Sequence, residues 1–245
     1  NNIIVVSEDM FNLINPSKIF VLIDKFIKFI NSIFFILLIV ALTFALILSP
    51  PDYLQGDSVR IMYVHVPSAW IALASFACIG LLSILSFIFR LKNLHLISKC
   101  IAPIGLLFTC LALITGSLWG QPTWGTWWAW DARITSMLIL LIFYILYVLS
   151  HKLIAQEDKA NKISNVIAII GLINIPIIKY SVDWWNTLHQ PKSINFVSGT
   201  STIHSSMLLP LALMLLVLLL YCALIFLMKY KTEIIRIKKK NIKRI

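Results

Sequence analysis

Six long apolar runs with short connections between them constrain this sequence more than any other feature. They lie at about 29–49, 66–89, 100–118, 134–150, 163–180 and 204–228. Charged residues make up only 13% of the chain, about half the share of an ordinary soluble domain. A helix needs roughly 20 apolar residues to cross the hydrocarbon layer, and the runs are long enough to do so. The sequence therefore predicts an all-α integral membrane protein, a bundle of six transmembrane helices.

The predicted organisation has three parts. Residues 1–28 form a cytoplasmic N-terminal segment, 29–228 the six-helix domain, and 229–245 a basic cytoplasmic tail. The fifth run contains Gly171 and Pro176, which a spanning helix tolerates where neighbouring helices satisfy the backbone. The tail is expected to anchor the topology and contact anionic headgroups, with partner binding as the alternative.

The distribution of Lys and Arg predicts which side of the membrane each connection faces. Cytoplasmic segments retain positive charge during insertion. Nearly all of the 21 basic residues lie in the N-terminal flank, the second and fourth connections and the tail; the other side has only Arg60, Arg133, Lys179 and Lys192. Both termini should therefore be cytoplasmic. The outer connections should lie at about 50–65, 119–133 and 181–203. Topology also accounts for the net charge of +11, so no nucleic-acid partner is expected.

The four cysteines argue against several other classes of protein. They all lie in apolar stretches, at Cys78, Cys100, Cys110 and Cys222, and none forms a C-x-x-C pair. Neither a disulfide framework nor a zinc site is indicated. The sequence also lacks C-x-x-C-H, the signature of covalent haem attachment. Any haem bound here would be held non-covalently.

Tryptophan is concentrated in the predicted outer connections. Trp70 lies just inside the outer end of the second run, and the other seven lie in the connections, at Trp119, Trp124, Trp127, Trp128, Trp130, Trp184 and Trp185. An interfacial aromatic belt is the alternative, but a belt decorates both interfaces. The segment 119–131, W-G-Q-P-T-W-G-T-W-W-A-W-D, instead suggests a binding platform. Flat aromatic faces suit a flat apolar macrocycle such as a porphyrin. Asp131 ends this platform, where it could cap the following helix, contact the ligand, or do both.

Two histidines flank the platform on the predicted outer side. His65 lies in R-I-M-Y-V-H-V-P-S-A-W and His189 in V-D-W-W-N-T-L-H-Q-P. Neutral imidazole is a common haem iron ligand, so the two could occupy opposite faces of one ring. His204 is a weaker rival for the place of His189. His95 and His151 fall on the cytoplasmic side and are expected to be bystanders.

Two arginines on the same side could contact the anionic propionates of a haem. Arg60 precedes His65 by five residues, and Arg133 follows Asp131 by two. The alternative is structural ion pairing, of Arg60 with Asp57 and of Arg133 with Asp131 or Asp183. The residues alone favour neither interpretation.

The segment W-G-T-W-W-A-W-D resembles the tryptophan-rich WWD signature of haem-handling proteins in cytochrome c biogenesis. Together with the two histidine segments and six spans, it resembles the CcmC family of the system I pathway over roughly residues 50–228. The first 28 residues lie outside the resemblance and begin without Met, which fits a truncated or processed chain.

The resemblance implies roles for the residues singled out above. His65 and His189 would be the axial ligands of the haem iron. The segment 119–131 would cradle the ring and present its edge to the haem chaperone CcmE. The further partners implied are the ATP-binding-cassette proteins CcmA and CcmB and the small protein CcmD.

The expected function is therefore delivery of haem b, held transiently, by a protein that is not an enzyme. A haem or small-solute permease is one alternative, although it would need more polar residues within the spans. A quinol-linked b-type cytochrome subunit is another, although no histidine pair lies mid-membrane. The expected location is a bacterial inner membrane with the WWD segment in the periplasm. The alternative is a mitochondrial inner membrane, with that segment facing the intermembrane space.

Overall fold

The computed structural model describes residues 16–89, 91, 94–189, 194–195, 200–201 and 203–242. The spans are built from α2 (Pro16–Thr43), α3 (Met62–Phe89), α4 (Leu94–Trp124), α5 (Ala132–Leu153), α6 (Glu157–Leu172), α7 (Asn174–Trp184) and α8 (Ser205–Ile242). A π-helical turn, Phe44–Leu48, extends α2, and a 3-10 turn, Asp57–Ile61, precedes α3. Two short antiparallel strands, β1 (Ile194–Asn195) and β2 (Thr200–Ser201), precede α8. Among the described residues, six helical segments are long and apolar enough to cross a membrane, which confirms the predicted six-helix membrane protein.

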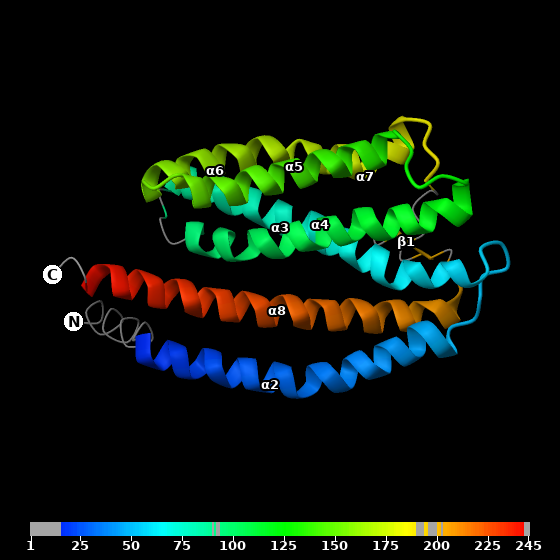
Figure 1. Cartoon of the computed structure of the whole chain (residues 1–245), viewed down its shortest axis with the longest axis horizontal. Coiled ribbons are helices and arrows are strands. Elements are labelled where there is room, and N and C mark those ends of the chain that lie inside the picture. The colour runs from blue at the N-terminus through cyan, green and yellow to red at the C-terminus, as the bar shows by residue number, and fades with distance from the viewer. Residues whose placement is uncertain are drawn as a thin grey trace.

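The helices lie roughly along one direction (Figure 1). α2 and α8 pack against each other along one side of the bundle, and α8 also contacts α3 and α4. The start of α2 and the end of α8 lie at one end of the bundle. The connections that follow α2, α4 and α7 lie at the other, which we call the loop end. Residues 1–15 of the predicted N-terminal segment, 243–245 of the tail and much of 190–202 lie outside the described residues.

The fifth span is two helices rather than one. α6 ends at Leu172 and α7 begins at Asn174. Pro176 has no amide hydrogen, so the helical hydrogen bonding cannot continue unbroken through this turn. The Asn174 side chain donates from Nδ2 to the backbone oxygen of Ser136 on α5, at 2.8 Å. A neighbouring helix thus supplies a hydrogen-bond acceptor at the break, which the lipid chains could not do.

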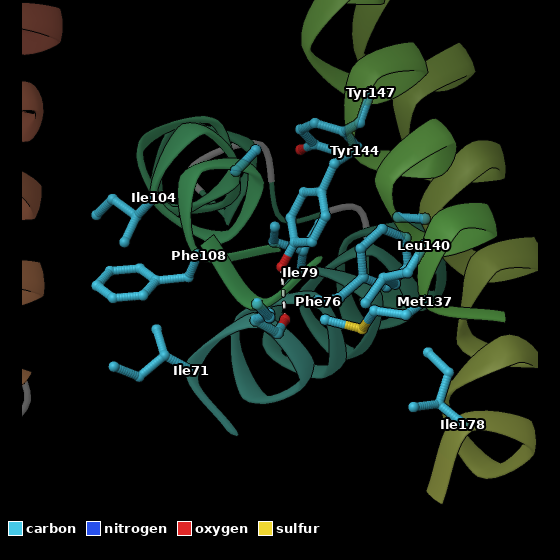
Figure 2. Close-up of a cluster of buried hydrophobic side chains, with 14 residues drawn as sticks. Ile71, Phe76, Ile79, Ile104, Phe108, Met137, Leu140, Tyr144, Tyr147 and Ile178 are labelled. Atoms are coloured by element: carbon cyan, nitrogen blue, oxygen red, sulfur yellow. Dashed lines mark hydrogen bonds between the residues drawn. The ribbon is translucent and has the colours of Figure 1, made fainter. Parts of the chain in front are cut away.

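A buried apolar cluster joins α3, α4 and α5 (Figure 2). Tyr144 and Phe76 are fully buried and make an edge-to-face contact, with ring centroids 4.9 Å apart. The Tyr144 hydroxyl donates to the backbone oxygen of Ala72 at 2.8 Å. Gly105 makes room for this ring, because a Cβ added there would lie 2.0 Å from the hydroxyl oxygen. Close packing therefore sets the spacing of these three helices.

The predicted tail is a helical extension of α8 that runs to Ile242. Its side chains form ion pairs with three other helices, with nitrogen–oxygen distances of 2.5–2.9 Å: Lys231–Asp24, Glu233–Lys99 and Lys240–Glu157. Partly exposed pairs of this kind each contribute little stability. Their arrangement nevertheless aligns the end of α8 with α2, α4 and α6.

Two predicted loops at the loop end are partly helical. α3 begins at Met62, so His65 lies in its first turn. α4 continues to Trp124 and ends where Gly125 takes the left-handed φ of 75°. The Gly125 amide donates to the backbone oxygen of Gln121 at 3.0 Å, which closes the last turn. The point at which the sequence stops being apolar was therefore a poor predictor of where a helix ends. A helix satisfies its own backbone hydrogen bonds outside the hydrocarbon layer as well as within it.

Candidate histidine and tryptophan site

The orientation of His65 is set by a residue on the neighbouring helix. Its Nδ1 lies 3.1 Å from the hydroxyl oxygen of Thr115 on α4. That hydroxyl already donates its hydrogen to the Leu111 backbone oxygen, at 2.6 Å. With that hydrogen in use, the Thr115 oxygen can accept from His65 Nδ1–H, and this tautomer leaves the Nε2 lone pair available. Gly116 makes room for the ring, because a Cβ there would lie 2.9 Å from His65 Cε1.

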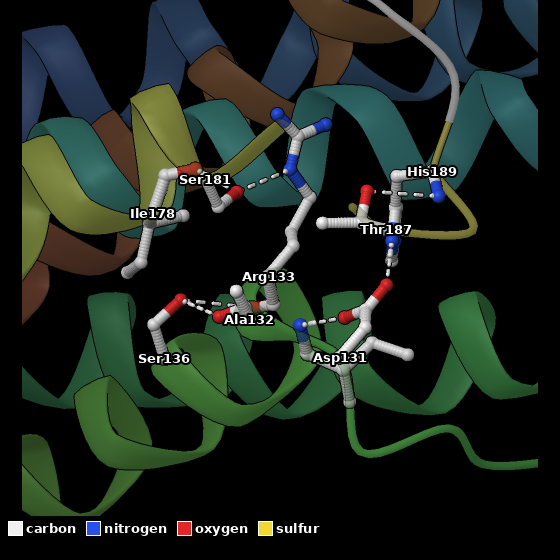
Figure 3. Close-up of polar contacts among 9 residues, drawn as sticks. Asp131, Ala132, Arg133, Ser136, Ile178, Ser181, Thr187 and His189 are labelled. Atoms are coloured by element: carbon white, nitrogen blue, oxygen red, sulfur yellow. Dashed lines mark hydrogen bonds and ion pairs between the residues drawn. The ribbon is translucent and has the colours of Figure 1, made fainter. Parts of the chain in front are cut away.

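His189 is held by a carboxylate at the start of α5 (Figure 3). Asp131 Oδ2 lies 2.8 Å from His189 Nδ1, and the two side chains are only 7% and 17% exposed, respectively. Asp131 Oδ1 accepts from the Ile134 amide at 2.8 Å and caps α5. The expected helix cap is confirmed, and the same carboxylate also binds the histidine.

His189 is in its neutral form at neutral pH. Burial lowers its pKa below the usual value, and the nearby positive charge of Arg133 lowers it further. The hydrogen bond and negative charge of Asp131 act in the opposite direction but do not outweigh burial. Since a carboxylate only accepts hydrogen bonds, the single ring hydrogen lies on Nδ1. Nε2 of His189 therefore also carries a lone pair.

This pKa makes a testable prediction for the protein without haem. The unfolded chain binds the His189 proton more tightly than the folded protein does. The contribution of His189 to stability should therefore be complete above its ordinary pKa of about 6.5, and be lost as the pH falls through the lower folded-state pKa. We expect acidification to lower the melting temperature of the parent more than that of His189→Gln. Equal losses in the two proteins would contradict the assignment.

The two histidines belong to one electrostatic environment. His189 and Arg133 both lie within electrostatic range of His65. Arg133 Nε donates to the Ser181 hydroxyl of α7 at 3.2 Å, and Asp131 and Asp183 both lie within electrostatic range of Arg133. The fold therefore gathers two imidazoles and a guanidinium from three different segments at the loop end.

The tryptophans at the loop end have different neighbours. Trp119 contacts His65, with ring centroids 5.7 Å apart, and donates from Nε1 to Gln55 at 2.8 Å. Trp124 makes an edge-to-face contact with His189, with centroids 4.8 Å apart. A shallow groove of about 310 Å³ is lined by Leu113, Ile114, Ser117, Leu118, Trp127 and Trp128. Trp119 and Trp124 therefore pack against the two histidine rings, whereas Trp127 and Trp128 line the groove.

The remaining candidates contact nearby side chains. Trp130 packs edge-to-face on Trp128, with centroids 5.4 Å apart, and is 76% exposed. Arg60 forms the alternative ion pair with Asp57, at 3.2 Å, but its Nε is buried without a partner among the described residues. His204 is exposed, and its Nδ1 lies 2.7 Å from the Ser206 hydroxyl at the start of α8.

Three residues of this site were not predicted from the sequence. Thr115 and Gly116 contact His65, and Gln55 binds Trp119. Thr115 precedes Trp119 by four residues and so shares its helix face. This four-residue spacing could have pointed to Thr115, but only if the helix were already known to extend as far as Trp119.

The fold and the site together define an integral membrane protein with two imidazoles and a cluster of indoles at one end of its bundle. The model of the heme exporter protein C family, CcmC, matches residues 9–244, and the chain belongs to this family. The match extends into the first 28 residues, so the expectation that they lie outside the resemblance was wrong.

Relatives occur in bacteria and plants. A heme exporter protein C from Bradyrhizobium diazoefficiens is 38% identical over 93% of this chain and 86% of its own length. The Escherichia coli K12 heme exporter protein C is 34% identical over 79% of this chain and 77% of its own. A putative cytochrome c biosynthesis ccmC-like mitochondrial protein from Marchantia polymorpha is 42% identical over 67% of this chain and 69% of its own.

Proposed function

We propose that this protein binds haem b non-covalently between His65 and His189 and delivers it to the haem chaperone CcmE, without acting as an enzyme. Membership of the heme exporter protein C family supports a role in haem handling for cytochrome c biogenesis. The observation that carries the finer proposal is the state of the two imidazoles. In each ring, Nδ1 lies within hydrogen-bonding distance of another side chain, and donation from Nδ1 would leave the Nε2 lone pair available for iron.

The neighbouring side chains suit the rest of a haem. Trp119 and Trp124 place indoles beside the two imidazoles, where they could contact the apolar ring. The buried Nε of Arg60 lacks a partner among the described residues and could donate to a propionate oxygen. Arg133 lies in the electrostatic environment of both histidines and is the second candidate.

The outer-face location and the further partners are part of the proposal. The positive-inside rule would put the loop end outside, in the periplasm of a bacterium or the mitochondrial intermembrane space. CcmE would then meet the haem there, and CcmA, CcmB and CcmD would assist its release. Relatives with both bacterial and mitochondrial names are consistent with either membrane.

Haem transfer tests the proposal directly. The detergent-solubilised protein, purified with its haem, would be mixed with the haem-free soluble domain of CcmE and then separated from it. We expect the haem to move to the chaperone. Haem that stays with the membrane protein would contradict delivery. Reduction of that haem by quinol would favour a cytochrome subunit, and haem transport in liposomes of this protein alone would favour a permease.

A smaller effect is expected from the residue that holds His65. Thr115→Val keeps the shape of the side chain but removes the acceptor for His65 Nδ1–H. Because a neutral hydrogen bond contributes about 0.5–1.5 kcal/mol, haem affinity should fall by roughly 2- to 12-fold. Haem titration followed by absorbance measures this, with Thr109→Val, a buried threonine bonded within its own helix, as the control. An unchanged affinity in Thr115→Val would show that this contact does not orient the ligand.

A further inference from the structure

We infer that Asp131 is a positioning residue that determines which nitrogen of His189 can bind iron, and that it couples this choice to the start of α5. The inference rests on the proposed haem function. Asp131 need not touch the haem for this role. It acts through the histidine, by accepting the hydrogen of Nδ1.

The two carboxylate oxygens of Asp131 have different partners. Oδ1 accepts from the Ile134 amide and Oδ2 accepts from His189 Nδ1–H, both at 2.8 Å (Figure 3). The side chain is 7% exposed, so little solvent is available to replace either partner. Both positions require an acceptor. A carboxylate meets that requirement, because it is an acceptor at both oxygens.

Other good helix caps meet only half of the requirement. Asparagine would cap α5 with its oxygen and present an NH₂ group to His189. His189 Nδ1 would then have to accept a hydrogen bond, and the ring hydrogen would move to Nε2. Nε2 would no longer have a lone pair with which to bind the iron. Serine caps a helix equally well but is too short to reach the imidazole, so both tautomers of His189 would be populated.

The histidine also contacts the other end of the same connection. Trp124 at the end of α4 packs against the His189 ring, and Asp131 lies at the start of α5. Gly120 makes room for the Trp124 indole, because a Cβ there would lie 2.9 Å from it. The short connection 125–131 is thus held to His189 from both sides. A displacement of this connection would disturb the iron ligand without any contact to the haem.

A substitution series at Asp131 separates positioning from capping. The visible spectra of the full-length parent, Asp131→Ser and Asp131→Asn, each purified with haem in detergent, would be compared at equal protein concentration. We expect the fraction of low-spin, six-coordinate haem to decrease in that order. In Asp131→Asn it should fall about tenfold or more, because a hydrogen bond to a charged acceptor is lost and its replacement favours the wrong tautomer. Added imidazole should restore the low-spin spectrum by taking the vacant position on iron.

A capping role alone predicts a different result, since Asp, Asn and Ser are all good caps. If both variants kept the parent spectrum, the inference would be overturned. The melting temperatures of the two variants identify a variant that is simply misfolded. His189→Ala provides the reference: if it loses the low-spin spectrum while Asp131→Asn keeps it, only the role of Asp131 is wrong. If His189→Ala also keeps the spectrum, the proposed ligand itself is wrong.

Discussion

Alanine at either His65 or His189 should abolish the low-spin haem spectrum of the purified protein. Each substitution removes one imidazole whose Nε2 is available for iron, so the metal would keep a single protein ligand and become high-spin. The double variant should retain no specifically bound haem. Visible spectra together with haem content per protein, measured on detergent-solubilised samples, check both expectations.

His204→Ala is the matched control for these variants. His204 is exposed at the start of α8 and bonds to Ser206, so its loss should leave the spectrum unchanged. If His204→Ala abolished the low-spin signal and His189→Ala preserved it, the second ligand would have to be reassigned. A parent protein without any bound haem would contradict the proposed function as a whole.

Gly105→Ala should destabilise the bundle, although an alanine normally stabilises a helix relative to glycine by about 0.5–1 kcal/mol. The added Cβ would lie 2.0 Å from the Tyr144 hydroxyl oxygen and 2.3 Å from the adjacent ring carbon. Tyr144 is fully buried and bonded to the Ala72 backbone oxygen, so it has no free space to move into. Overpacking of this kind typically costs about 1–3 kcal/mol. Thermal unfolding in detergent should therefore show a lower melting temperature.

A double-mutant cycle identifies the cause of this effect. In a Tyr144→Leu background the obstructing hydroxyl is absent, and Gly105→Ala should cost much less or become stabilising. Tyr144→Phe removes the hydroxyl that bonds to Ala72 but keeps the ring, and it should cost about 1 kcal/mol. A melting temperature for Gly105→Ala at or above that of the parent would show that α4 and α5 are not packed as closely as described.

The sequence was sufficient for the architecture because membrane insertion depends mainly on local hydropathy. The six apolar runs correspond to the six spans, and the start of α2 and the end of α8 lie at the same end of the bundle. The residue types at the loop end were also visible, because tryptophan and histidine are scarce enough to be noticed. The helix cap at Asp131 followed from its place before an apolar run, and the structure confirms it.

The sequence did not reveal how these residues are oriented. The acceptor that orients His65 lies 50 residues away, at Thr115, and the one that orients His189 lies 58 residues away, at Asp131. The extension of α4 to Trp124, the break in the fifth span and the neighbours of the individual indoles were not predicted either.

Hydropathy therefore determined how many helices this chain has and which residues gather at the loop end. The tertiary structure alone decided which side chains contact Nδ1 of each imidazole and which indoles pack against the two rings. The physical reason is that a side-chain hydrogen bond depends on the rotation and register of two packed helices. These are set by close contacts such as that of Gly105 with Tyr144, which no local pattern encodes.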